Sequence, residues 1–210
     1  MQQTRNKKAA ARPAKRLRAP ERRRLILDEA QSILASRGFA ALTLRNAADA
    51  SGIRLSTLQY YFPTREQLFE AAFQDIADRA WSEIMLLVQN DESRDPRHRL
   101  QRFIKGLCSS TEDEVLIGFF VELWAAARTH EFASKIMQIY YEDALALLAR
   151  LIRDNQPGMS AKEGKQRATL ILSTVEGLSL FRQMDKRKER TGAVSRRSAV
   201  ECLTKLALQS

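Results

Sequence analysis

Few side chains in this 210-residue chain are arranged for catalysis. The two histidines, His98 and His130, and the two cysteines, Cys108 and Cys202, lie far apart and show none of the usual metal-site spacings. The sequence also lacks the motifs of nucleophilic hydrolases, phosphate-binding loops, dinucleotide-binding folds and zinc proteases. We therefore expect no catalytic residue, no metal site and no cofactor. The chemistry that remains is recognition by amides, guanidinium groups and hydroxyls.

Recognition candidates cluster in residues 44–62, where the spacing indicates two short helices joined by a glycine turn. Ala48 is small enough for a second helix to cross at its position, and Gly52 suits a left-handed turn. Leu58 is expected to fill the angle between the helices. This geometry is that of the DNA-binding helix-turn-helix, whose second helix enters the major groove. A helical hairpin without a DNA-binding role is the alternative for this spacing.

The residues around this motif carry a wider resemblance. They are Gly38-Phe39, Leu42-Thr43-Leu44-Arg45, Ala47-Ala48, Ser51-Gly52-Ile53 and the run from Thr57 to Leu68. Over roughly residues 25–70, the chain resembles the N-terminal domain of the TetR family of transcriptional regulators. Two positions depart from the family pattern: Arg54 replaces the usual serine or threonine, and Gln59 stands where an aromatic residue is frequent. Both positions face the groove in that family, so the operator sequence stays open.

The resemblance implies a recognition helix at Leu55–Tyr61. By their chemistry, Arg54 can bond a guanine edge and Gln59 an adenine edge, while Leu55 and Thr57 can touch a thymine methyl. The tyrosine pair would lie near the DNA backbone, and the threonines and arginines flanking the two helices would hold phosphates. The expected DNA contacts are Thr43, Arg45, Arg54, Leu55, Ser56, Thr57, Gln59, Tyr60, Tyr61, Thr64 and Arg65.

The elements that must position these residues are helices, since hydrophobic residues recur at helical spacing throughout the chain after residue 20. The pattern predicts an all-α fold of about nine helices, with a three-helix helix-turn-helix domain before a helical ligand-binding and dimerisation domain. The first helix is expected from Glu21 to Gly38, the seventh from 131 to 154 and the last at roughly 196–208. Asp95-Pro96 should open the fifth helix. Capping boxes are expected at Thr64/Gln67, Thr111/Glu114, Ser160/Glu163 and Ser198/Glu201.

Charge divides the chain unevenly. Residues 1–24 carry a net charge of +9 and residues 182–197 a net charge of +5, whereas residues 25–181 carry −4. We expect a disordered basic arm at 1–20, a helix-turn-helix domain at 21–66 and the second domain at 67–210. The arm could contact DNA phosphates or could be a passive tail. No apolar stretch is long enough to span a membrane, so a cytoplasmic protein is expected.

Aromatic residues are frequent in the middle of the chain, where the resemblance implies a pocket for a small-molecule effector. The candidate ligand-binding residues are Phe103, Leu107, Phe120, Trp124, Met137, Tyr140 and Tyr141. Nearby polar groups that could orient a ligand are Glu122, Arg128, His130, Gln138, Glu142 and Asp143. Aromatic residues at helical spacing are also common in ordinary cores, which is the alternative here.

A dimer is expected because one recognition helix reads only a few base pairs, and specific binding normally pairs two of them about a two-fold axis. The last two helices are the candidate interface, since residues 170–181 are more apolar than one buried face requires. The expected interface residues are Leu170, Ser173, Thr174, Gly177, Leu178, Phe181, Leu203 and Leu206. An intrachain core helix is the alternative.

Together these features predict a sequence-specific, DNA-binding transcriptional regulator, most simply a ligand-responsive repressor that binds a palindromic operator as a homodimer. Two other classes stay open: a helical scaffold that binds a ligand or a partner protein, and a protein that coats DNA without sequence preference. The expected partners are double-stranded DNA, a second copy of the chain and a small-molecule effector. The effector, the operator, the target genes and the choice between repression and activation do not follow from the sequence.

Overall fold

The computed structural model describes residues 18–90, 95–185 and 194–209. Within these ranges the chain forms nine α-helices and one short 3₁₀-helix and no strand, which confirms the expected all-α class. The elements are α1 (Ala19–Arg37), η1 (Phe39–Ala41), α2 (Leu44–Ala50), α3 (Leu55–Tyr61), α4 (Arg65–Gln89), α5 (Pro96–Ser110), α6 (Glu114–Ala127), α7 (Glu131–Asp154), α8 (Ala161–Asp185) and α9 (Arg196–Leu208). The expected basic arm lies outside the described residues except for its last three positions. The helical spacing also predicts an eighth helix that extends to about residue 187, and this end lies outside the described residues as well.

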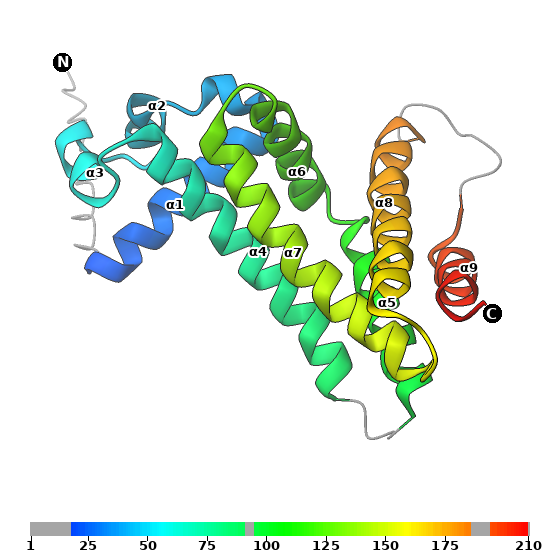
Figure 1. The fold of residues 1–210 in the computed structure, drawn as a ribbon. Helices are drawn as coiled ribbons and strands as arrows, with labels where there is room; N and C mark the ends of the chain where they lie inside the picture. Colours follow the sequence, from blue (N-terminus) through cyan, green and yellow to red (C-terminus); the bar gives the residue numbers. More distant parts are fainter. Residues whose placement is uncertain (1–17, 91–94, 186–193, 210) are drawn as a thin grey trace, which may run out of the picture.

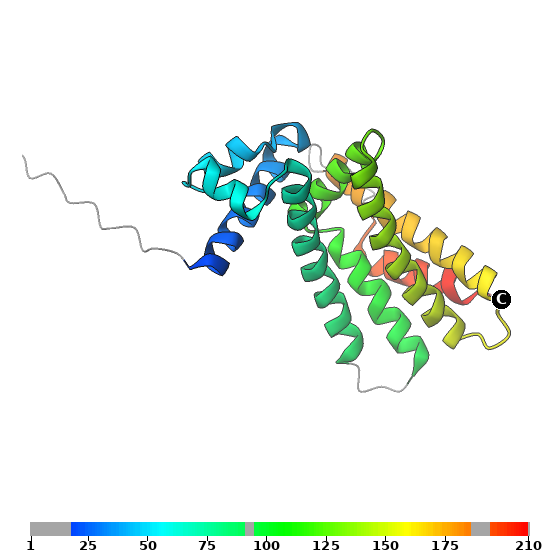
Figure 2. The ribbon, with the colours of Figure 1, turned by 60° about the vertical axis from the view of Figure 1, so that its left-hand side comes forward.

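Helices α1 to α3 gather at one end of the molecule, and α8 and α9 lie at the other (Figure 1). Helices α4, α5 and α7 run along one another between these ends, with α8 against α7 (Figure 2). Because α4 follows α3 and packs against α5, it joins the α1–α3 end to the rest of the molecule.

The turn between α2 and α3 has the geometry that the sequence predicts. Thr43 caps α2 by accepting a hydrogen bond from the Asn46 backbone N–H at 3.0 Å. Gly52 has φ +64°, a left-handed conformation that favours glycine. Ala48 and Leu58 are both buried, so the small residue admits the crossing helix and the leucine fills the angle beneath it.

The expected caps of α4 and α5 are present, but two other predicted caps are wrong. Helix α6 is capped by Asp113, whose carboxylate accepts hydrogen bonds from the Val115 and Leu116 N–H groups. The Thr111 hydroxyl instead donates to the Cys108 carbonyl at the end of α5 and accepts a hydrogen bond from Arg182. Helix α9 is capped by Ser195 instead of Ser198. In both cases the first helical turn lies close to the expected position, and a different side chain satisfies its N–H groups.

Helix α1 starts at Ala19, two residues before the expected Glu21, because the Glu21 carboxylate reaches back to the Arg18 N–H at 2.7 Å. Its buried Gln31 holds it against α4 by donating to the Ala72 carbonyl and the Asp75 carboxylate. Arg24 pairs with the same carboxylate at 2.5 Å. These polar contacts fix α1 on the first half of α4.

Two hydrophobic cores organise the described residues. The first contains side chains from α1 to α3, the first half of α4, α6 and the start of α7. The second contains side chains from the end of α4, α5, the second half of α7, α8 and α9. Helix α4 belongs to both, since Phe69 lies in the first core and Ile84 in the second. The first core therefore extends across the domain boundary expected at residue 66, and that boundary stays a prediction.

Replacing Leu58 by alanine should destabilise the whole first core. The side chain is 0% exposed, so its removal leaves a cavity between α2 and α3. We expect the free energy of unfolding in urea to fall by about 2–5 kcal/mol. Tyr60→Ala is the matched control, since Tyr60 is 83% exposed on the same helix. Equal stability of the two variants would contradict the role assigned to Leu58.

Candidate nucleic-acid interface and body cavity

Helix α3 presents a polar face to solvent. Arg54, Ser56, Gln59 and Tyr60 are exposed, and they follow the helical period around the buried Leu58. The other predicted contacts on this helix, Leu55, Thr57 and Tyr61, are half-buried at the edge of that face. The helix therefore carries donors, acceptors and methyl groups on a surface that a DNA groove can accept.

The predicted phosphate contacts beside α3 divide into two kinds. Arg45 is exposed and can reach a phosphate. The hydroxyl oxygens of Thr43 and Thr64 accept capping bonds from backbone N–H groups, which leaves each hydroxyl proton to donate elsewhere. Thr64 and the first N–H groups of α4 also offer the positive end of a helix dipole.

Arg65 does not join this phosphate-facing set. Its guanidinium lies 4.0 Å from the centroid of the Phe39 ring and donates to the Phe39 carbonyl. Stacking on the ring and bonding to the backbone both turn the side chain toward η1 and away from the exposed face of α3. The structure thus places Arg65 inside the protein junction, where it positions η1 against α4.

Phe39 is the centre of that junction. Its ring packs edge-on against Phe69 of α4 at 5.0 Å between centroids, and it lies tilted against Phe132 of α7 at 6.2 Å. Its backbone N–H donates to the Glu122 carboxylate of α6 at 2.5 Å. Gly38 has φ +76°, and a Cβ there would lie 3.0 Å from the same carboxylate. Glu122, expected among the polar groups near a ligand, instead ties α6 to η1.

A narrow cavity lies at the meeting point of the two cores. Four of the seven predicted ligand-binding residues line it: Leu107, Phe120, Trp124 and Tyr140. The other lining residues are Trp81, Ser110, Leu116, Ile117, Ala144, Leu172, Val175, Glu176 and Ser179. The centre of a water-sized sphere can move through only about 30 Å³ of this space, which is room for one or two water molecules.

Three predicted ligand-binding residues lie behind the cavity wall. Phe103 is fully buried in the second core and packs edge-on against Trp81, so it supports the wall without reaching the cavity. Met137 packs against the first core. Tyr141 contributes through hydrogen bonds: its hydroxyl accepts from the Trp124 indole N–H at 2.9 Å and donates to Glu176 at 3.0 Å.

Among the lining residues that were not predicted, Glu176 is the one that carries a carboxyl group. Burial raises the pKa of its carboxyl to about 7, against the smaller, lowering effect of the Tyr141 hydrogen bond. Burial and the nearby carboxylate also raise the pKa values of Tyr140 and Tyr141. An acid within a largely apolar segment was the available signal, but the apolar residues of 170–181 lie on more than one side of the helix and do not indicate which way the acid faces.

The predicted dimer residues on α8 are exposed or half-buried, whereas one of the two on α9 is buried. Leu170 and Phe181 are exposed large hydrophobic residues, and Ser173 and Thr174 are exposed beside them. Gly177, Leu178 and Leu206 are half-buried. Leu203 is only 3% exposed because it packs into the second core of its own chain, so it is not available as a surface contact.

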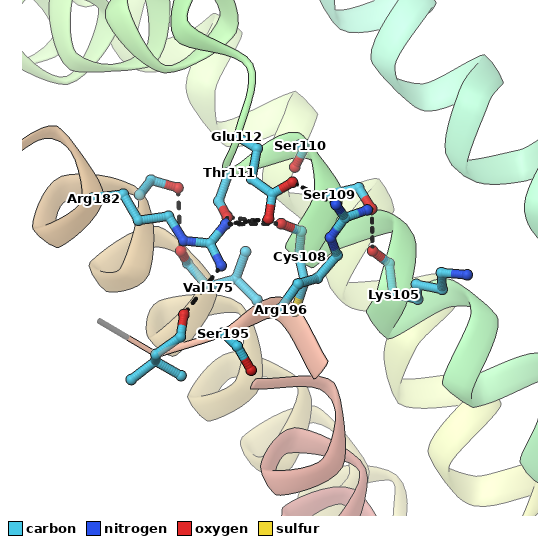
Figure 3. Close-up of polar contacts among 12 residues, drawn as sticks. Lys105, Cys108, Ser109, Ser110, Thr111, Glu112, Val175, Arg182, Ser195 and Arg196 are labelled. Carbon is cyan, nitrogen blue, oxygen red and sulfur yellow. Dashed lines mark hydrogen bonds and ion pairs between the residues drawn. The ribbon is translucent and has the colours of Figure 1, made fainter. Parts of the chain in front are cut away.

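Arg182 joins the end of α8 to two other elements (Figure 3). Its guanidinium donates to the Thr111 hydroxyl and the Cys108 carbonyl at the end of α5, and it pairs with Glu112 at 3.2 Å. Arg196, at the start of α9, pairs with the same Glu112 carboxylate at 2.8 Å. The turn after α5 is thereby fixed to both α8 and α9.

The two cysteines have different surroundings. Cys108 is buried in the second core, and burial raises the pKa of its thiol to about 11. Cys202 is exposed on α9. In the part of the chain that the structure describes, no three histidine, cysteine or carboxylate side chains gather as possible metal ligands. None of the helices in the described ranges has both the length and the apolar content of a membrane span.

Comparison with known proteins agrees with this architecture. Residues 26–72 match the family model of bacterial regulatory proteins of the tetR family. Residues 96–205 match the model of the C-terminal domain of BetI-type transcriptional repressors. The first match covers the exposed α3 helix and its flanks. The second covers α8, most of α9 and every cavity-lining residue except Trp81.

Individual relatives are distant in sequence. An uncharacterised helix-turn-helix transcriptional regulator of Xanthobacter autotrophicus is 27% identical over 74% of this chain and 76% of its own length. The helix-turn-helix transcriptional repressor KstR of Rhodococcus jostii is 24% identical over 84% of this chain and 79% of its own length.

Solved structures share the fold. A protein of Pseudomonas aeruginosa described as a transcriptional regulator superposes with a TM-score of 0.79 at 18% identity, over 91% of this chain and 90% of that one. A protein of Saccharomonospora viridis, solved in complex with choline, has a TM-score of 0.71 at 19% identity, over 89% of this chain and 95% of that one.

Replacing Glu176 by glutamine should stabilise the protein at alkaline pH. The folded pKa of about 7 exceeds the reference value of 4.5, so the unfolded chain ionises first and stability falls between these pH values. Glutamine removes that loss, and we expect a gain of roughly 2–3 kcal/mol in unfolding free energy at pH 8.

The gain should be much smaller at pH 5, where the unfolded carboxyl is only partly ionised. Urea unfolding of the unchanged protein and of the Glu176→Gln variant at pH 5 and pH 8 measures this gain in stability. Glu142→Gln, on the exposed surface of α7, is the control and should change little at either pH. A gain of equal size at pH 5 and pH 8 would refute the titration of Glu176 as its origin.

Proposed function

Because this chain belongs to the TetR family of bacterial regulatory proteins, we propose that it is a ligand-responsive repressor that binds a palindromic operator as a homodimer. The chain is a helix-turn-helix transcriptional regulator that binds DNA, and it is not an enzyme. The symmetry of the operator, the dimer and the response to an effector are the proposal. Because a bacterial regulator of this kind acts on the chromosome, we propose that the protein is cytoplasmic.

The exposed polar face of α3 is the observation that carries the DNA-reading role. Its buried side is held by Leu58, and Arg54, Gln59 and Tyr60 are exposed among the residues that the structure describes. Arg45, Thr43 and the start of α4 flank this face, where phosphate contacts would set its register on the duplex.

The apolar surface of α8 supports a two-fold dimer. Leu170, Leu180 and Phe181 are exposed on one helix, and a monomer gains nothing by leaving three large hydrophobic side chains in water. A two-fold axis beside α8 would cover the same residues on both copies, because such an interface uses one surface patch twice.

The cavity supports an effector site in the body. It is lined by elements of both cores, and Trp81 brings the wall onto α4, the helix that starts beside the recognition helix. A ligand that widened the cavity would displace α4 and change the spacing of the two recognition helices in the dimer. The choline bound to the Saccharomonospora viridis protein supports a small-molecule site in this fold.

Selection of binding sites from random DNA by the full-length protein at physiological salt tests the proposal. We expect an enriched palindrome whose two half-sites are one helical turn, or a multiple of it, apart. Binding without sequence preference that disappears as salt rises would favour a DNA-coating protein. A protein that binds no DNA would favour a ligand-binding or partner-binding scaffold, and either result would contradict the proposal.

Two substitutions should separate base reading from phosphate contact. Gln59→Ala should reduce the free energy of operator binding by about 1–3 kcal/mol and relax the sequence preference at one base pair of each half-site. Arg45→Ala should weaken binding to all sequences alike and reduce the salt slope by about 1 per copy. Competition binding at several salt concentrations measures both effects. If the two variants showed the same sequence preference and the same salt slope, the assigned roles would be wrong.

Phe181→Glu should dissociate the homodimer. Its side chain is 67% exposed on α8, so the change introduces a charge into the proposed interface without disturbing the core. Ile139→Glu on α7 is a matched control, since Ile139 is 65% exposed away from that face. Sedimentation velocity should show monomers for the first variant and dimers for the second. Dimers in both variants would exclude this face as the interface.

A further inference from the structure

Glu176 is a half-buried acid that has no cationic partner among the described residues. It lines the cavity, and among the residues that the structure describes the only hydrogen-bond donor to its carboxylate is the Tyr141 hydroxyl. No lysine or arginine in those ranges forms an ion pair with it. Because a charge in an apolar site is unfavourable unless it is paired, this arrangement is incomplete as it stands.

The hydrogen-bond chain around Glu176 holds the carboxylate in a fixed position. The Trp124 indole N–H donates to the Tyr141 oxygen at 2.9 Å, so the Tyr141 proton is left to donate to Glu176 at 3.0 Å. All three residues come from different helices, α6, α7 and α8. The acceptor is therefore oriented before any ligand arrives, which lowers the cost of binding one.

Aromatic rings form the rest of the wall. Phe120 packs against Tyr140 at 5.1 Å between centroids and against Trp124 at 6.4 Å, and Trp81 lies on the α4 side. The faces of such rings attract organic cations, most strongly for tryptophan and tyrosine. The lining therefore combines one carboxyl group, held in place by Tyr141, with several aromatic rings and contains no positively charged side chain.

We propose that this cavity binds an organic cation, an ammonium group with apolar substituents, whose charge pairs with the Glu176 carboxylate between the aromatic rings. The inference rests on the proposed function, because it names the chemical class of the effector. An anion would be repelled by the carboxylate, and no positively charged side chain of the lining would attract it. A neutral ligand would supply no counter-charge to the carboxylate.

The size of the cavity links occupancy to the position of α4. The free space accommodates one or two water molecules, so even a small ammonium ion must push lining side chains apart. Trp81 and Leu107 belong to α4 and α5, whereas Glu176 belongs to α8. Binding therefore separates α8 from the α4–α5 side or rotates the rings between them.

The chain contains its own reporter of occupancy. It has two tryptophans, Trp81 and Trp124, and both line the cavity. Titration of the full-length protein can thus be followed by tryptophan fluorescence and quantified by calorimetry. The probes are tetramethylammonium, tert-butanol and pivalate, which have similar size and carry positive, zero and negative charge. Sodium chloride keeps the ionic strength constant throughout.

We expect saturable binding of tetramethylammonium and at least about tenfold weaker binding of the other two probes. Glu176→Gln should weaken the binding of tetramethylammonium by at least about tenfold, because the ion pair is lost while the side chain keeps its shape. Tyr141→Phe removes the hydroxyl that orients Glu176 and should weaken the binding of tetramethylammonium by a smaller factor. Glu142→Gln, an exposed acid on α7, should bind as the unchanged protein does.

Several results would overturn the inference: tert-butanol or pivalate binding as tightly as tetramethylammonium, no saturable change with the cation, or unchanged affinity in the Glu176→Gln protein. Failure of the proposed function is seen separately, in the selection of DNA sites. An enriched palindrome without cation binding rejects the effector class and leaves the regulator intact. Cation binding that leaves the operator complex unchanged supports the cavity assignment and rejects its coupling to DNA.

Discussion

Helix α4 has to satisfy two hydrophobic cores at once, and most of the architecture follows from that requirement. Its first half packs under the DNA-binding helices through Phe69, and its second half packs against α5 through Ile84. Because close-packed cores transmit displacement instead of absorbing it, α4 cannot shift in one core without disturbing the other. Trp81, between these two positions, is where the cavity meets the helix. A signal from the body therefore needs no separate pathway.

The junction at Phe39 adds a second connection, this time through α6. The carboxylate of Glu122 holds the η1 backbone, and the guanidinium of Arg65 covers the Phe39 ring. Helix α6 also contributes Phe120 and Trp124 to the cavity wall. Helices α4, α6 and α7 all contact the DNA-binding end, and all three line the same cavity. The helix-turn-helix is consequently part of a larger packed unit, although its sequence resembles an independent domain.

The sequence predicts the helices and the recognition face well because both depend on local spacing. The Ala48, Gly52 and Leu58 pattern is enough to locate the turn, and the seventh helix has the expected limits. Contacts between distant segments are another matter. The direction of Arg65 depends on Phe39, 26 residues earlier, and the orientation of Glu176 depends on Tyr141, 35 residues earlier. Hydrophobic periodicity contains no information on such pairs. The sequence therefore predicts Arg65 only as a DNA contact and does not identify Glu176.

The difference between the two cysteines has a practical consequence. A thiol reagent attacks the thiolate of an accessible cysteine, and Cys108 offers neither accessibility nor an easily formed thiolate. Cys202, exposed on α9 beside the proposed two-fold axis, is addressable in the unaltered chain. One spin label per copy would attach there, and the separation of two labels reports directly on how the subunits rotate. The native sequence thus already contains the probe position that an inter-subunit distance measurement requires.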